Sequence, residues 1–129
     1  VGNYIMKNLA LLISLVFGFT YGQEKNCSEF KTGKFEYVSE EYPEQIVRND
    51  TIQIEINPIS KIEIYSTIEW VSECEYILTY KKVLNSPLDE SEYLGKQIYV
   101  EIIETKGNKY KVHASSDVMN TFLEFARTD

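Results

Sequence analysis

The sequence predicts an all-β protein, an antiparallel up-and-down meander of about seven strands that forms a small barrel or a curled sheet. Apolar and polar residues alternate over most of the chain after residue 23, which is typical of antiparallel strands with one face in water. Short turn signals separate these runs. No long helical pattern alternates with the strands, so a parallel α/β sheet is disfavoured.

The alternating runs also predict which side chains face inward. In "TIQIEIN" (51–57) the three isoleucines share one face, and Gln53 and Glu55 share the other. We therefore expect the isoleucines in the core and the two polar residues in water. The later runs predict these further inward residues: Ile62, Ile64, Ile68, Trp70, Ile98, Val100, Ile102, Tyr110, Val112 and Ala114.

The ends of the strands are predicted from turn residues. Turn signals lie at 48–50, 57–60, 71–73 and 106–108. An opening strand is expected at 34–38, where Gly33 permits a bend or a close backbone approach. The segment 121–127 fits either a short helix capped by Asp117 or a final strand, and its alternation favours the strand.

The connection "NSPLDESEYLGK" (85–96) departs from the strand pattern. Ser86 at the N-cap, Pro87 at the first helical position and Gly95 at the stop predict a short helix within 86–95. This helix is interpreted either as a lid over an open barrel end or as a simple crossover between two strands. The crossover is the favoured interpretation.

Two segments are expected in the chain: upstream residues plus a signal peptide at 1–22, and a single secreted β domain at 23–129. The basic start at Lys7, the apolar run at 9–19 and the small residues before Gln23 are typical of a secretory signal. The run is shorter than the ~20 residues that cross a bilayer. We therefore expect an exported protein, periplasmic or extracellular, with no membrane span in its mature form.

The two cysteines, Cys27 and Cys74, are expected to form a disulfide. They are too far apart for a CxxC redox motif, and no His or Cys cluster has metal-ligand spacing. A bridge closing a loop of this length stabilises a fold by roughly 4 kcal/mol in the chain-entropy treatment. We expect a structural role for the pair, and neither a metal nor a cofactor.

Charge and motifs argue against two functional classes. The net charge is −7, without a cluster of Lys and Arg, which disfavours binding to nucleic acid. The single histidine, His113, alternates with lysines on an expected solvated face and lacks the orienting partner that a catalytic triad needs. Glu55 and Glu69, on neighbouring strands, are a possible carboxylate pair, but both are expected to point outward. An enzyme is therefore the less favoured class.

Five residues are predicted to form a ligand site, if the protein has one. Arg48, Gln53 and Glu55 would make polar contacts, and Tyr76 and Tyr80 would make apolar ones. Arg48 lies beside a hairpin turn, where it could bind a carboxylate bidentately. It could equally form an ordinary surface ion pair with Glu55, and this second interpretation is favoured.

The leading hypothesis is therefore a non-enzymatic exported β-barrel that binds a small apolar or mixed ligand. The alternative is a cell-envelope interaction module that binds a protein or a glycan on a sheet face.

Three fragments resemble a group of uncharacterised small exported β-rich proteins of flavobacteria and other Bacteroidota. They are "FKTGKFEY" (30–37), Arg48 followed by "QIE" (53–55), and "IEWVSECEYIL" (68–78). The resemblance implies a host lineage and an export route rather than an activity. "TGKF", with Phe35 in place of Trp, is also similar to the Gly-x-Trp opening of lipocalins, and this similarity implies a lipocalin- or calycin-like barrel.

Overall fold

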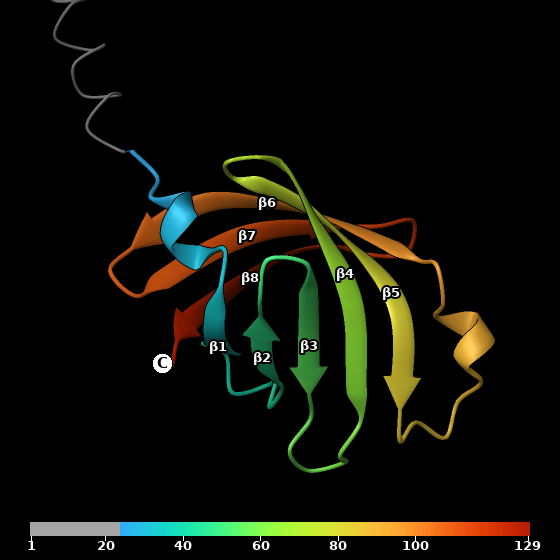
Figure 1. Ribbon diagram of the computed structural model, residues 1–129. Coiled ribbons are helices and arrows are strands. Elements are labelled where there is room, and N and C mark those ends of the chain that lie inside the picture. Colours follow the sequence, from blue (N-terminus) through green and yellow to red (C-terminus); the bar gives the residue numbers. More distant parts are fainter. Residues whose placement is uncertain (1–23) are drawn as a thin grey trace, which may run out of the picture.

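Each strand of the chain pairs with the next one, and the last strand pairs with the first, so that the sheet closes into a barrel (Figure 1). The computed structural model describes residues 24–129, and the signal peptide expected at 1–22 lies outside them. The elements, in chain order, are η1 (Cys27–Phe30), β1 (Gly33–Tyr37), β2 (Gln45–Arg48), β3 (Ile52–Ile56), β4 (Glu63–Ser72), β5 (Glu75–Leu84), η2 (Glu90–Glu92), β6 (Gln97–Lys106), β7 (Lys109–Ser115) and β8 (Asn120–Arg127).

The predicted fold class is confirmed, with eight antiparallel strands instead of about seven. The additional strand is β2, which is only four residues long. All four predicted turns connect consecutive strands, and 121–127 is a strand, as its alternation favoured. The β4–β5 and β6–β7 hairpins each show a shift in register between their two strands. Such irregularities increase the local twist of a sheet and help it to close.

The connection between β5 and β6 contains a single 3-10 turn, η2. Its N-cap is Asp89, whose carboxylate accepts from the Ser91 backbone N–H, and not the predicted Ser86. None of the η2 residues is buried, and no residue of 85–96 is among those that line the barrel interior. In Figure 1, η2 lies to the outside of β5. β5 and β6 are neighbours in the sheet, so the segment simply connects two adjacent strands, as the favoured interpretation has it, and the structure does not place it as a lid over the cavity.

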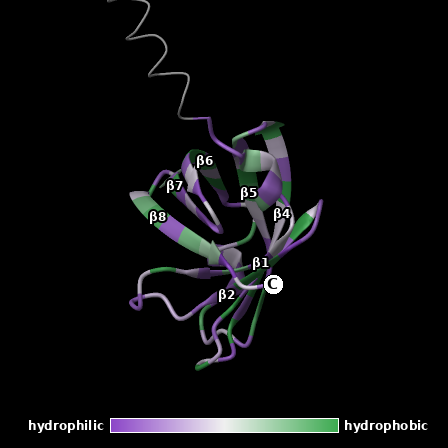
Figure 2. Ribbon diagram, turned by 90° about the vertical axis from the view of Figure 1, so that its left-hand side faces the viewer, coloured by the Kyte–Doolittle hydropathy of each residue, from purple (hydrophilic) through white to green (hydrophobic). Residues whose placement is uncertain are grey.

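Side chains alternate between the interior and the solvent along the strands, and Figure 2 shows hydrophobic and hydrophilic colours alternating along β8. Most of the predicted inward residues are confirmed. The buried ones are Ile68, Val100, Ile102, Tyr110, Val112 and Ala114. Trp70 and Ile98 are partly buried and pack against this core, and Ile64 lines the barrel interior.

The orientation of β3 is the reverse of the prediction. Gln53 is only 5% exposed and Glu55 lines the interior, whereas Ile52 is 40% exposed. Directly opposite residues of an antiparallel pair project to the same face. Gln53 and Glu55 lie opposite Arg48 and Ile46 of β2, both of which are buried. The register of the β2–β3 hairpin therefore turns the polar residues of β3 inward.

The helix η1 closes one end of the barrel, next to the β6–β7 hairpin (Figure 1). The predicted disulfide is present: Cys27 in η1 is bonded to Cys74, in the turn before β5, with their Cα atoms 5.3 Å apart. Phe30, at the end of η1, is buried against the rings of Phe35 and Tyr110. The disulfide therefore holds in place the segment whose Phe30 side chain packs into this end of the barrel.

Arg127, near the end of β8, joins the last strand to the same end of the barrel. Its guanidinium lies 5.1 Å from the ring centre of Phe35 and donates to the carbonyl of Glu29. Gly33 makes room for this contact. A Cβ atom on Gly33 would lie 2.3 Å from Nη1 of Arg127, and the φ angle of +136° disfavours any other residue.

Candidate functional site

The barrel interior contains a cavity of about 270 Å³. All five residues predicted for a ligand site, Arg48, Gln53, Glu55, Tyr76 and Tyr80, line this cavity. The other lining residues are Tyr37, Glu44, Ile46, Ile64, Leu78, Ile98, Val100, Val112, Ala114, Met119, Leu123 and Phe125. Two groups of polar side chains, one near each end, face a largely aliphatic middle.

The first group surrounds Arg48, which is 3% exposed. Its Nε atom donates to Oε1 of Gln53 at 3.0 Å, and Nη1 donates to the backbone carbonyl of Phe30 at 2.7 Å. Its Nη2 atom donates to the hydroxyls of Tyr76 at 3.2 Å and Tyr110 at 3.1 Å. Four acceptors from four different elements therefore meet at one guanidinium.

Aromatic rings enclose the same guanidinium. Its carbon atom lies 5.0 Å from the ring centre of Phe35, 4.9 Å from that of Tyr76 and 5.8 Å from that of Tyr110, distances typical of cation–π contacts. We call this group of side chains, with Phe30, the η1 end of the interior. The surface ion pair expected between Arg48 and Glu55 is absent, because β2 directs Arg48 inward. The only ion pair within residues 24–129 joins Arg127 to Asp129.

The charge of Arg48 is thus balanced by dipoles and rings rather than by a carboxylate. Guanidinium stays protonated in proteins. Burial raises the pKa of the Tyr76 hydroxyl more than the nearby charge of Arg48 lowers it, so this hydroxyl is neutral. Hydrogen bonds to a buried ionised group replace the water that the group loses. The η1 end is a polar network in which four N–H groups of Arg48 have acceptors in the protein.

The second group, which we call the acidic end, consists of Tyr37, Glu44, Glu55 and Tyr80. The hydroxyl of Tyr37 donates to Oε1 of Glu55 at 2.6 Å. The side chain of Asn57 donates to Oε1 of Glu44 at 3.3 Å. The other oxygen of Glu44, Oε2, is buried and has no hydrogen-bond partner within the described residues. Two carboxylates here share two donors, and neither donor is charged.

The pKa values at the acidic end reflect this arrangement. Burial raises the pKa of Glu55, the hydrogen bond from Tyr37 lowers it, and the charge of Glu44 raises it again, with a net increase. Burial, together with the charge of Glu55, raises the pKa of Tyr80 to about 12. Burial also raises the pKa of Tyr37, to which the charge of Glu55 and their hydrogen bond add. The acidic end therefore resists the accumulation of negative charge.

Sequence reasoning missed three of these polar side chains. Glu44 precedes β2 in a loop, so no strand pattern indicates its direction. Tyr37 lies at the end of β1, and alternation with buried Phe35 could have placed it inward. Tyr110 was expected in the core, but nothing in the sequence connects its hydroxyl to Arg48, 62 residues away.

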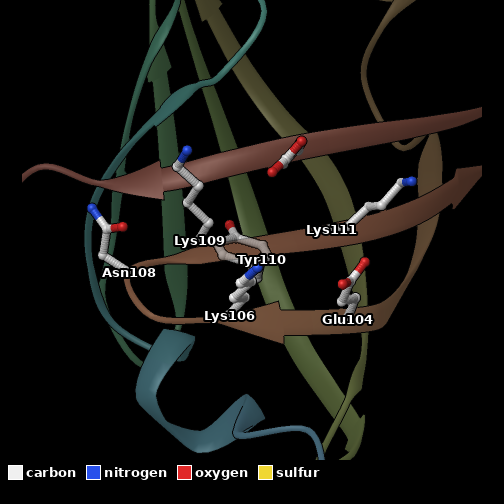
Figure 3. Close-up of a pocket in the computed structure, with 7 residues that line it drawn as sticks. Glu104, Lys106, Asn108, Lys109, Tyr110 and Lys111 are labelled. Atoms are coloured by element: carbon white, nitrogen blue, oxygen red, sulfur yellow. The ribbon is translucent and has the colours of Figure 1, made fainter. Parts of the chain in front are cut away.

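A second hollow lies on the outer face of the β6–β7 hairpin and β8 (Figure 3). Figure 3 shows the side chains of Lys106, Lys109 and Lys111 around it, with Glu104 on the neighbouring strand. Lys111 lies directly opposite both Glu104 and Glu124 in the sheet. These exposed charges of both signs resemble an ordinary solvated surface.

His113 occupies the outer face of β7, as the sequence predicted. Its Nε2 atom lies 2.5 Å from Oδ1 of Asn120, and its ring centre lies 5.1 Å from that of Phe122. Glu69 is exposed on the outer face of β4, whereas Glu55 points into the barrel. The possible carboxylate pair of Glu55 and Glu69 is therefore wrong, because the two side chains lie on opposite faces of the sheet.

Within residues 24–129, no three His, Cys, Asp or Glu side chains are grouped closely enough to hold a metal ion. No helix in the same range has the length and apolar character needed to cross a bilayer. No family model, curated protein or solved structure matches the chain.

Proposed function

We propose that this chain is a non-enzymatic barrel protein that binds a small ligand of mixed apolar and polar character inside the barrel. The observation that supports the proposal most strongly is the interior cavity, which combines an aliphatic wall with polar groups near each end. Such a combination is typical of small-molecule sites, where a few polar groups orient a mostly apolar ligand.

The volume of the cavity limits the size of the ligand. A cavity of about 150 Å³ is large enough for benzene, and sites for drug-sized ligands begin at about 300 Å³. At about 270 Å³, the interior suits a molecule somewhat larger than benzene. The aliphatic wall is formed mainly by Leu78, Ile98, Val112 and Leu123.

An exported location and a lipocalin-like character are part of the same proposal. The Cys27–Cys74 disulfide is compatible with an oxidising compartment, where such bonds persist. The "TGKF" segment begins the first barrel strand, and Phe35 packs beneath Arg127 of the last strand. Fractionation of the host, followed by detection of the processed chain outside the cytoplasm, tests the export.

Native mass spectrometry of the protein purified from its own host tests ligand binding. Ala114 is buried and lines the cavity, so Ala114→Leu should fill part of that space. Ser115 is the next residue on β7 and points to the other face, so Ser115→Leu is the matched control. We expect a bound small molecule on the wild type and on the control, but not on Ala114→Leu.

The proposal is contradicted if the wild-type protein carries no small molecule and binds an apolar fluorescent probe no better than Ala114→Leu does.

Exposed aromatic residues favour a second function, in which the sheet surface binds a protein or glycan of the cell envelope. Tyr99 on β6 is 52% exposed and Phe122 on β8 is 61% exposed, and exposed apolar patches often mark interaction sites. If the double variant Tyr99→Ser/Phe122→Ser loses binding to an envelope glycan or protein while Ala114→Leu retains it, the second function is favoured.

A further inference from the structure

We propose that the acidic end of the cavity binds the ammonium group of a small organic amine, whose apolar body lies along the aliphatic wall. The inference rests on the proposed ligand-binding function and adds the chemical class of the ligand. Two independent features support it: the charges that line the cavity, and a buried carboxylate oxygen without a partner.

The charge balance of the cavity is incomplete. Glu44 and Glu55 are its acidic lining residues, and Arg48 is its one basic lining residue. Arg48 is not within ion-pair distance of either carboxylate, and four of its N–H groups already have acceptors in the protein. A cationic ligand group would supply the partner that the two carboxylates lack.

The hydrogen bonds at the acidic end lead to the same conclusion. Oε2 of Glu44 is buried without a hydrogen-bond partner in the described part of the chain, which is costly for a carboxylate. Glu55 receives one hydrogen bond, from Tyr37. A primary ammonium has three N–H donors and no acceptor, so one ligand group has enough donors to bond both carboxylates.

The aromatic side chains at this end also suit a cation rather than an anion. Tyr37 and Tyr80 both line the cavity beside the carboxylates, and ring faces attract ammonium groups. The ring of Phe125 lies 4.7 Å from that of Tyr37 and borders the aliphatic wall. An amine with an apolar body would thus place its ammonium group between the two carboxylates and its apolar body against the aliphatic side chains of the wall.

The η1 end does not offer an equivalent site for an anion. The guanidinium of Arg48 is enclosed by rings and bonded to Gln53, Phe30, Tyr76 and Tyr110. A carboxylate ligand would have to displace these neutral acceptors. The ammonium is therefore the favoured ligand group.

Calorimetry with three probes that share a phenylethyl body tests this inference: 2-phenylethylamine, 2-phenylethanol and 3-phenylpropanoate. We expect the amine to bind the wild type at least about tenfold more tightly than the alcohol, because hydrogen bonds between charged groups are stronger than neutral ones and close charge pairs can couple strongly. Binding of the amine should strengthen as the pH rises and Glu55 ionises, whereas binding of the alcohol should not change.

The variants localise the effect. Glu55→Gln keeps the shape of the side chain and removes its charge, so its affinity for the amine should fall about tenfold or more, while its affinity for the alcohol stays the same. Glu69→Gln, on the outer face of β4, is the matched control and should bind the amine like the wild type. Ala114→Leu should bind neither probe.

Three results would overturn the inference. If 3-phenylpropanoate binds most tightly, or if the amine and the alcohol bind equally well, the interior is a ligand site but not one for amines. If none of the three probes binds, the amine site is wrong, and the comparison of Ala114→Leu with Ser115→Leu decides separately whether the cavity holds any ligand.

Discussion

The two ends of the barrel interior both contain buried charge, but they satisfy it differently. At the η1 end, the guanidinium of Arg48 has four hydrogen-bond acceptors and three ring faces around it. At the acidic end, Glu44 and Glu55 have one neutral donor each. A buried charge that is fully bonded can stabilise a unique fold, whereas one left short of partners costs stability. We therefore assign a structural role to the η1 end and a ligand-binding role to the acidic end.

Among changes near the η1 end, loss of the disulfide should have the largest effect on the stability of the protein. Replacing both cysteines by alanine, Cys27→Ala/Cys74→Ala, should lower the free energy of unfolding by roughly 4 kcal/mol, because the crosslink spans 47 positions and restricts the unfolded chain. Urea denaturation measures this difference. The intact mass before and after alkylation of the native wild type is the control, since two readily alkylated thiols would refute the bridge.

Removal of the charge of Arg48 at the η1 end should lower the free energy of unfolding slightly less than loss of the disulfide does. Arg48→Met keeps most of the side-chain volume but leaves Gln53, the Phe30 carbonyl and two tyrosine hydroxyls without their donor. We expect a loss of about 3 kcal/mol, because buried polar groups without partners are costly. Lys111→Met on the exposed face of β7 is the control and should change stability by less than about 0.5 kcal/mol. Equal effects of the two variants would show that the network is unimportant.

Disruption of the contact between the first and last strands, β1 and β8, should lower the free energy of unfolding less than Arg48→Met does. Gly33→Ala combines an unfavourable φ of +136° with a Cβ atom 2.3 Å from Arg127 Nη1, and we expect a loss of about 2 kcal/mol. Gly107 also has a positive φ, but a Cβ atom there would meet nothing within 4 Å. Gly107→Ala should therefore cost only about 1 kcal/mol. Thermal unfolding of both variants separates backbone strain from the clash with Arg127.

A change at the acidic end should have the opposite sign. The pKa of Glu55 is raised in the folded protein, so its contribution to stability is full below the pKa of the unfolded chain and is lost as the pH rises through the folded value. Glu55→Gln lacks this loss and should be more stable than the wild type at neutral pH, by up to about 1 kcal/mol. The advantage should disappear in acid. If Glu55→Gln is instead less stable at neutral pH, the carboxylate already has the partners it needs.

The sequence predicted much of this barrel because several of its strands follow a simple alternation. In β6 and β7 the residues Val100, Ile102, Val112 and Ala114 are buried as their pattern indicates. The pattern failed in the β2–β3 hairpin, where Ile52, the first strand residue of β3, faces solvent. A barrel interior that holds polar groups reverses the usual relation between hydropathy and burial, and alternation alone cannot show which face of such a strand turns inward.

The same reversal explains what could be predicted of the site. Arg48, Gln53 and Glu55 were identified by their chemistry, and they do line the cavity, although Gln53 and Glu55 were expected in water. Glu44 could not be predicted, because its position depends on the loop between β1 and β2 and on a contact with Asn57. Contacts between segments far apart in the chain are fixed by the closed sheet, and local sequence does not encode them.

The most direct test of the account is a carbon-13 NMR titration of the Glu55 carboxyl, with and without 2-phenylethylamine. In the free protein, Glu55 should titrate above the ordinary value of about 4.3, and saturation with the amine should lower its pKa, because a bound ammonium stabilises the ionised form. The alcohol 2-phenylethanol should leave the titration unchanged. A Glu55 that titrates at the ordinary value in the free protein, or whose pKa does not respond to the amine, would contradict the claim that the acidic end lacks a cationic partner.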